Sequence, residues 1–262
     1  MATLPTSTRR NNGPPKDVGT INLGVSFNLM STARFNLPHS NAETMLRSLS
    51  FILVAGLLTA CGGSEGTEVE SSDAQAETTA AASATYTVDA QASTVEWEGT
   101  KLIGGGHQGT IPISQGQLET NGNELVGGSF TLDVTGLENS DLGPDDGKAK
   151  LEGHLKSPDF FDVEQYPTAK FVITSVSPIT DAEDGHNYDI TGNLTLKGTS
   201  RSITIPANVT MDGDRITATT PDFVIDRTEW GMEYGSGGLE GIAQDNIIND
   251  EVGLKLDLVA QR

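Results

Sequence analysis

The sequence predicts an all-β domain over residues 86–262 of the 262-residue chain. From Tyr86 onward, apolar residues alternate with polar ones, which is the pattern of antiparallel strands with one buried face. Turn-forming residues separate these stretches. Eight to ten short strands of this kind either stack as a sandwich or close as a barrel, and closure would remove the edges of so large a sheet.

Residues 45–60 have the organisation of a secretory signal. Arg47 supplies the positive start, and residues 51–58 are apolar and uncharged but shorter than the roughly 20 residues that span a bilayer. The segment ends in Leu58-Thr59-Ala60-Cys61, and Cys61 is the only cysteine of the chain. This order resembles the bacterial lipobox, whose cysteine is diacylated and becomes the mature N-terminus. The alternatives are an ordinary signal peptide with a coincidental cysteine, or a short buried apolar segment.

The lipobox predicts where the protein resides. We expect cleavage before Cys61, lipid on its sulfur, and a membrane anchor on the periplasmic side of the cell envelope. Gly62 favours the outer membrane in a cell with two membranes. Residues 1–44 contain several arginines and prolines and no apolar period, so we interpret them as an extension before the true start at Met45. The alternative is an unusually long positive region of the signal.

The charge of the chain excludes one class of partner. It has 16 basic and 36 acidic residues and a net charge of −20. Removal of residues 1–60 takes away five basic and two acidic residues, which leaves 11 and 34 and a net charge of −23. Such a field repels nucleic acid and anionic headgroups. We therefore expect no nucleic-acid partner, and membrane contact through the acyl anchor rather than a basic patch.

Residues 61–85 are predicted to be the lipidated cysteine and a disordered acidic tether. Between Gly62 and Ala84 the only β-branched aliphatic residue is Val69, and the rest is mainly Ser, Thr, Ala, Glu and Gly. Such a composition buries too little apolar surface to fold. Fully extended, these 23 residues would span roughly 75 Å.

The strands of the domain are predicted by alternation. Their apolar positions lie within residues 95–99, 130–134, 169–173, 194–196, 203–209, 223–225 and 252–260. The turns between them are predicted at Asn121-Gly122-Asn123, Gly127-Gly128, Lys197-Gly198 and Asp212-Gly213-Asp214. One region differs: residues 146–155 are typical of a short helix, and Ser157-Pro158-Asp159 is typical of the start of another. The domain therefore has one or two short helices.

Four motifs, in a fixed order, carry a family resemblance. They are Trp97-x-Gly99-x-Lys101-x-x-Gly104-x-x-His107-x-Gly109; Gly153-His154-Leu155-Lys156-Ser157-Pro158-Asp159-Phe160-Phe161-Asp162-Val163 with Tyr166-Pro167-Thr168-Ala169-x-Phe171; Ile190-Thr191-Gly192-x-Leu194-Thr195-Leu196-Lys197-Gly198; and Phe223-x-Ile225-Asp226-Arg227-Thr228-x-Trp230-Gly231. Together they resemble the YceI family of periplasmic or secreted lipid-binding proteins. The resemblance covers about residues 86–262.

The resemblance implies an eight-stranded antiparallel barrel, lipocalin-like in shape, around an apolar tunnel for a polyisoprenoid or a quinone-type isoprenoid tail. A barrel of this size has room for about one slender ligand. The residues expected to line the tunnel lie on the apolar side of each alternation. They are Trp97, Phe130, Leu132, Phe171, Ile173, Leu194, Leu196, Ile203, Phe223, Ile225 and Trp230.

Three polar residues near the apolar stretches are candidates for contact with a ligand headgroup. His107 and His154 are interpreted as hydrogen-bonding residues near the barrel mouth or as headgroup contacts. Arg227 is interpreted as an ion-pair partner of Asp226 or Asp162, with headgroup binding as the alternative. No two-histidine zinc spacing is present and no nucleophile stands beside a histidine, so we expect no metal, cofactor or catalytic residue.

The sequence thus predicts a non-enzymatic, membrane-tethered protein that carries or sequesters an isoprenoid lipid. The alternative is a structural or stress lipoprotein whose barrel is filled by its own side chains. A hydrolase or isomerase of a lipophilic substrate is a third hypothesis. A homodimer is compatible with the sequence, and residues 86–262 are expected to fold without the first 85.

Overall fold

The computed structural model of the protein describes residues 63–77, 81–180, 182, 185–239 and 241–262. The predicted extension 1–44, the signal 45–60 and Cys61 lie outside the described residues. Within those residues no helix has the length and apolar character needed to cross a membrane.

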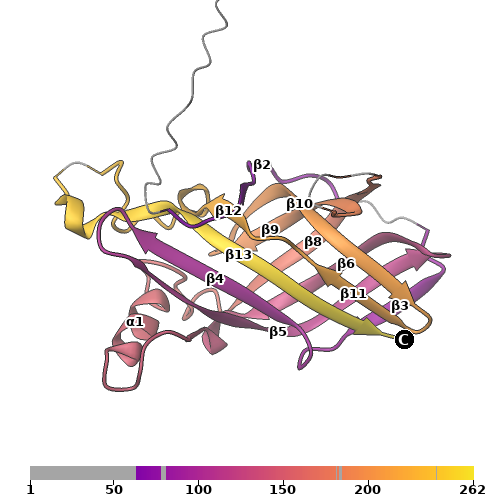
Figure 1. Ribbon diagram of the computed structural model, residues 1–262, viewed down its shortest axis with the longest axis horizontal. Coiled ribbons are helices and arrows are strands. Elements are labelled where there is room, and N and C mark those ends of the chain that lie inside the picture. Colours follow the sequence, from indigo (N-terminus) through magenta and orange to yellow (C-terminus); the bar gives the residue numbers. More distant parts are fainter. Residues whose placement is uncertain (1–62, 78–80, 181, 183–184, 240) are drawn as a thin grey trace, which may run out of the picture. The chain divides into compact units, whose positions relative to one another are not determined.

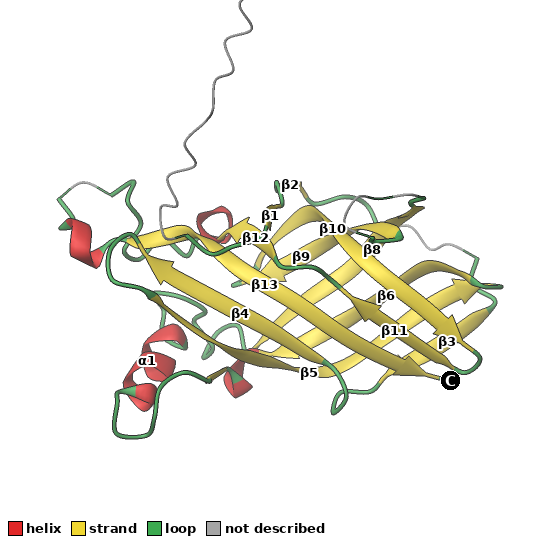
Figure 2. Ribbon diagram, in the orientation of Figure 1, coloured by secondary structure: helices red, strands yellow, loops and turns green. Residues whose placement is uncertain are grey.

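Strands dominate the described part of the chain (Figure 2). They are β1 (Thr67–Glu68), β2 (Ser72–Asp73), β3 (Ala84–Val88), β4 (Thr94–Lys101), β5 (Gly106–Asn121), β6 (Glu124–Asp133), β7 (Glu138–Asn139), β8 (Thr168–Pro178), β9 (Tyr188–Leu196), β10 (Thr199–Asp212), β11 (Arg215–Thr219), β12 (Phe223–Asp226) and β13 (Ile248–Gln261). One α-helix, α1 (Lys148–Leu155), and three 3-10 turns, η1 (Val134–Gly136), η2 (Arg227–Trp230) and η3 (Gln244–Asn246), complete the described structure.

The long strands close into a ring of antiparallel pairs (Figure 1). β13 pairs on one edge with β12 and then β11, and on the other edge with β4 and then β3. The pairs β10–β11, β9–β10, β8–β9, β6–β8 and β5–β6 continue the ring, which returns through β5 to β3 and β4. If the broken positions β3/β4 and β11/β12 count once each, the ring has eight strands. The predicted all-β barrel is confirmed.

Three of the predicted turns join neighbouring strands. Gly122, Gly198 and Gly213 have left-handed φ values of 62°, 76° and 58°, at the hairpins β5–β6, β9–β10 and β10–β11. The fourth turn was wrong. Gly127 and Gly128 lie inside β6, where the register with β5 shifts by a bulge. Glycine is common at such bulges because the extra residue needs an unusual backbone conformation, and Gly128 has φ 146°.

The predicted disordered tether was wrong for part of its length. β1 pairs in parallel with β12, and β2 pairs antiparallel with β10. We call residues 63–77 the strap. One edge of β12 pairs with β13, and β1 of the strap pairs with the other edge. β2 of the strap pairs with the first half of β10, so the strap lies between β12 and β10. Val69 is buried in the core, and Gln75 exchanges two backbone hydrogen bonds with the Asn193 amide at 2.9 and 2.8 Å.

The helical region was predicted correctly for one helix. α1 lies within the predicted range 146–155, at one end of the barrel (Figure 1). The second helix does not form. Ser157–Phe161 instead turns back onto α1, with the Phe161 N–H bonded to Leu155 O at 3.1 Å, and Asp162 adopts a left-handed φ of 50°. The residues that follow α1 therefore lie close to it.

Candidate functional site

A cavity of about 780 Å³ lies inside one half of the barrel. Its wall comes from β4, β5, β6, β8, β9, β10, β12 and β13, and α1 lies at its open end. The loop between β4 and β5 and the chain between η2 and β13 also contribute residues at this end. We call this end the mouth. The lining is mainly aliphatic and aromatic, which suits hydrocarbon better than a polar solute.

Most of the residues predicted to line a tunnel lie in this wall. These are Trp97, Phe130, Leu132, Phe171, Leu194, Leu196, Ile203, Phe223 and Ile225. Ile173 and Trp230 are buried but lie outside the lining. Trp230 belongs to η2, where its indole N–H donates to Leu194 O at 2.9 Å and holds the ring against β9. That these residues bind a ligand stays a prediction.

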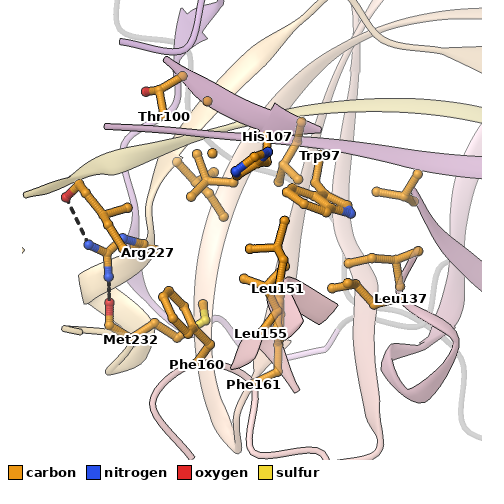
Figure 3. A pocket seen from close by; sticks show the side chains of 18 of the residues that line it. Trp97, Thr100, His107, Leu137, Leu151, Leu155, Phe160, Phe161, Arg227 and Met232 are labelled. Atoms are coloured by element: carbon orange, nitrogen blue, oxygen red, sulfur yellow. Dashed lines mark hydrogen bonds between the residues drawn. The ribbon is translucent and has the colours of Figure 1, made fainter. Parts of the chain in front are cut away.

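The sequence did not predict the lining near the mouth. Leu151 and Leu155 project from α1 into the cavity, and Phe160 and Phe161 follow from the turn after it (Figure 3). Leu137 comes from the chain between η1 and β7. These residues lie on irregular segments, so no period-two alternation marks them. The apolar positions of residues 146–155, spaced as in a helix, were the available signal.

The other half of the barrel is filled by side chains. Large residues there are buried and absent from the cavity lining. They include Ile113, Leu118, Ile173, Ile190, Val209, Ile216 and Leu258. A separate, smaller hollow of about 300 Å³ is lined by Leu125 and other residues of β6, β8 and β9. Val95, Ile111 and Leu256, which are paired neighbours on three strands, are among the deepest residues of the lining. The cavity is therefore a blind tunnel within the described structure.

Arg227 is buried at the mouth and holds loops together. The residue is 2 % exposed. It donates to Asn249 O at 3.1 Å, to Ile248 O at 3.1 Å and to Met232 O (Figure 3), and it pairs with Asp250 at 3.2 Å. Burial lowers its pKa, although the charge of Asp250 acts in the opposite direction.

The predicted ion pair of Arg227 with a carboxylate is present, and its partner is Asp250 rather than Asp226 or Asp162, which the sequence offered as examples. Asp250 lies on β13, after the long loop that follows η2. Because the two residues are far apart in the sequence, nothing in the sequence indicated that Asp250 would contact Arg227. Asp226 accepts from the Thr228 N–H at 2.8 Å and caps η2. The donors of Arg227 face protein carbonyls and a carboxylate, which favours a structural role over headgroup binding.

His154 belongs to an aromatic cluster at the mouth. Its ring lies edge-on to Phe160 and to Tyr234, with centroids 5.1 and 4.7 Å apart, and its Nε2 is 3.0 Å from Asp159. His154, Phe160 and Tyr234 all line the cavity. The cluster links the helical end of the mouth to the loop that carries Tyr234.

His107 belongs to a polar network that reaches α1. Its Nδ1 lies 2.8 Å from Asp141, which also accepts from the Gln108 N–H at 2.9 Å and from the Asn139 amide. Partial desolvation raises the pKa of Asp141, but these hydrogen bonds outweigh it and lower the pKa from 3.8 to about 2. The Asn139 N–H donates to Glu152 at 2.8 Å, so the network also fixes α1.

The Trp97 indole N–H is buried and has no hydrogen-bond partner among the described residues. Such groups are rare in folded proteins because their desolvation is uncompensated. Because Trp97 lies in the lining, we expect its fluorescence to change when a ligand enters the cavity.

The described residues contain no group of three or more His, Cys, Asp or Glu side chains placed to hold a metal ion. The two histidines at the mouth each pair with a single aspartate. What the site offers chemically is an apolar volume with a polar and aromatic edge.

A family model described as a YceI-like domain matches residues 86–260. The chain belongs to the YceI family. The Escherichia coli O17:K52:H18 protein YceI is 40% identical over 70 residues, which is 27% of this chain and 34% of that protein. UPF0312 protein PC1_2518 of Pectobacterium carotovorum is 39% identical over a stretch with the same coverage. This chain therefore matches about a third of the length of these YceI relatives.

Two solved structures are also similar in fold. BcnA of Burkholderia cenocepacia superposes with a TM-score of 0.52 at 26% identity, over 66% of this chain and 99% of that one. A domain of Saccharophagus degradans described as polyisoprenoid binding gives a TM-score of 0.48 at 16% identity, over 67% of this chain and 97% of that domain.

Proposed function

We propose that this YceI-family protein binds one end of an isoprenoid lipid, a polyisoprenoid or a quinone-type tail, and carries or sequesters it in the cell envelope without chemical conversion. The observation that carries the proposal is the blind apolar tunnel of about 780 Å³. Burial of hydrocarbon there gains about 25 cal/mol per Å² removed from water. Membership of the YceI family supports the same class of ligand.

The volume sets how much of the lipid fits. If each heavy atom takes about the 30 Å³ of a water molecule in the liquid, the tunnel holds on the order of 25 atoms. That equals roughly five isoprene units, since each has five carbons. A longer chain extends out through the mouth, past the aromatic cluster of His154, Phe160 and Tyr234.

The envelope location and the anchor are part of the proposal. The lipobox order before Cys61 supports an acyl anchor, and Gly62 supports the outer membrane where two membranes exist. Replacement of Cys61 by Ser is expected to move the protein from the membrane fraction to the soluble fraction. If the Cys61→Ser protein stays with the membranes, the anchor lies elsewhere.

The second candidate function is a structural or stress lipoprotein without a ligand. The side-chain-filled half of the barrel favours it, because a carrier for a whole long lipid would use the full length of the barrel. The open half opposes it, because a purely structural barrel has no use for an apolar cavity of this size.

The test of binding is Leu132→Trp, which places a large ring in the tunnel. We expect the variant to fold, to lose about 1–3 kcal/mol of stability from overpacking, and to lose isoprenoid co-purification. The measurement is mass spectrometry of organic extracts of the purified, untagged protein. The matched control is Leu118→Trp, which overpacks the filled half and leaves the tunnel open.

The two variants separate binding from folding. Equal loss of lipid from both would mean that destabilisation, not blockage, causes the loss. If folded Leu132→Trp carries as much isoprenoid as the parent, the ligand is not in the tunnel and the carrier proposal fails.

A further inference from the structure

Four large apolar side chains are strongly exposed in the described structure. They are Leu102 (41 %), Ile103 (54 %), Tyr234 (46 %) and Leu239 (45 %). They lie on only two segments, the loop that joins β4 to β5 and the loop between η2 and β13. We call these four residues the apolar rim. Isolated exposed apolar residues are ordinary, but a group of them marks an interaction surface.

The two loops of the apolar rim lie against each other at the mouth. The Leu102 N–H donates to Ile247 O at 3.0 Å, and the Ile248 N–H donates to Gly235 O at 2.8 Å. Both loops therefore border residues 247–248. Gly104 and Tyr234, one from each loop, also line the cavity. The apolar rim is thus the edge of the opening through which a ligand passes.

The strap fixes where the proposed anchor leaves the barrel. The Ser64 hydroxyl donates to Glu98 O on β4 at 3.2 Å. The Thr67 N–H donates to Asp222 O at 3.0 Å, and the Val69 N–H donates to Val224 O on β12 at 2.9 Å. A chain held in this way does not act as the long free spacer that the sequence predicted.

Covalent geometry then limits the position of Cys61. Ser64 is three steps along the chain from Cys61, which is about 10 Å of extended chain. Glu98 is likewise three residues, about 10 Å, from the end of β4 at the mouth. The opposite end of the barrel is out of reach, because Gln261 lies eight residues, about 26 Å, beyond the Gly253 that pairs with Glu98.

We infer that the apolar rim rests in the surface of the lipid bilayer, so that the mouth opens directly onto the membrane. The inference rests on the proposed acyl anchor at Cys61, which holds the rim near the bilayer at high effective concentration. Insertion is apolar rather than electrostatic, since the net charge of −23 that remains after the expected removal of residues 1–60 repels anionic headgroups. A lipid then enters the tunnel from hydrocarbon without passing through water.

The test places a fluorescent reporter in the rim of the acylated protein that begins at Cys61. Ile103→Trp is reconstituted into vesicles of phosphatidylcholine with or without brominated acyl chains, whose bromine quenches tryptophan on contact. Ile103 does not line the cavity, so the substitution leaves the tunnel unchanged. The matched control is Asn123→Trp, an exposed position in the β5–β6 hairpin at the opposite end. The unsubstituted protein supplies the background from Trp97 and Trp230.

We expect the brominated vesicles to quench most of the emission added by Ile103→Trp and none of that added by Asn123→Trp. Flotation of the same samples tests the anchor separately. Protein that does not float overturns both the anchor and the docking. Protein that floats with Ile103→Trp unquenched, or with both reporters quenched alike, overturns the docking alone.

A second variant links the rim to transfer. Ile103→Asp is expected to slow isoprenoid uptake from vesicles about tenfold or more, because one apolar side chain moved into hydrocarbon gains at least the corresponding free energy. Isoprenoid binding in detergent is expected to be unchanged. Uptake at the parental rate would contradict the inference, as would a soluble Cys61→Ser dimer that Ile103→Asp dissociates, since the rim would then be an interface between two copies.

Discussion

Gly109 marks the tightest approach between strands at the mouth. A Cβ built on it would overlap Glu138 O and lie 2.8 Å from Trp97 Cζ2. We expect Gly109→Ala to lower the free energy of unfolding by about 1–3 kcal/mol, because β7 or Trp97 would have to move. Urea denaturation measures the change. Gly99→Ala is the control, since its Cβ would meet nothing within 4 Å, and equal losses in both variants would contradict the explanation.

Asp141 makes the mouth sensitive to acid. Its folded-state pKa is lowered to about 2, so its ionised form is favoured by folding. The stability that it contributes is complete above its unfolded pKa, near 4, and is lost as the pH falls to about 2. We expect the stability difference between the parent and Asp141→Asn to shrink over this window in urea titrations. A difference that does not change with pH would contradict this assignment.

At the scale of single residues, period-two alternation predicted which side chains line the cavity better than which side chains bind one another. It placed nine residues in the cavity wall, because a pleated strand fixes which face a side chain takes. It failed for Trp230, which lies in η2 where period two does not hold. It gave no information on the Asp250 partner of Arg227, because that contact depends on how a long loop folds.

The strap is the element with the clearest energetic role. It supplies Val69 to the core from a segment whose other residues are mostly exposed. We expect Val69→Asp to lower the free energy of unfolding by about 2 kcal/mol or more, because it removes a buried side chain and buries an unpaired charge. Thermal unfolding by circular dichroism measures the loss.

Thr67→Asp is the matched control, since it adds the same charge at an exposed position of β1. A similar loss in both variants would indicate that the strap does not pack as the structure shows. A fragment that starts at residue 81 is likewise expected to fold with reduced stability. The expectation that residues 86–262 fold without the first 85 therefore stays, with lower stability than the domain that carries the strap.

The strap was not predictable from its composition. Two strands of two residues each are too short to show a period, and one valine does not indicate a core segment. What orders the strap is the unpaired edge of β12, a property of the sheet rather than of the segment. The second predicted helix failed for a similar reason, since contacts with α1 turn the chain back at Asp162.

At the scale of the whole molecule, the barrel was predictable and the cavity was not. Period-two alternation and the ordered family motifs both indicated an antiparallel barrel. Neither indicated that side chains such as Leu118 and Ile216 fill one half while the other half stays open. Whether a part of the barrel is filled or open depends on the summed volume of the side chains that all the strands place there. The sequence of any single strand does not determine this sum.

The size of the cavity predicts a limit to chain-length dependence. We expect the affinity for isoprenoid alcohols to rise with length, by up to about 0.8 kcal/mol per buried CH₂, until roughly five units fill the tunnel. Beyond that length the affinity is expected to level off. Titration of Trp97 fluorescence measures it, with Trp230→Phe retaining the signal and Trp97→Phe losing it. An affinity that rises equally up to about ten units would contradict a blind tunnel.

The filled half of the barrel gives the molecule a direction. A tube open at both ends lets a chain thread through, whereas a tube closed at Val95, Ile111 and Leu256 admits it only by one terminus and returns it by the same route. For the isoprenoid ligand proposed above, such a tunnel distinguishes the two ends of the molecule, because it hides the tail and leaves the other end presented. An enzyme that acts on the presented end would then not need to empty the barrel first.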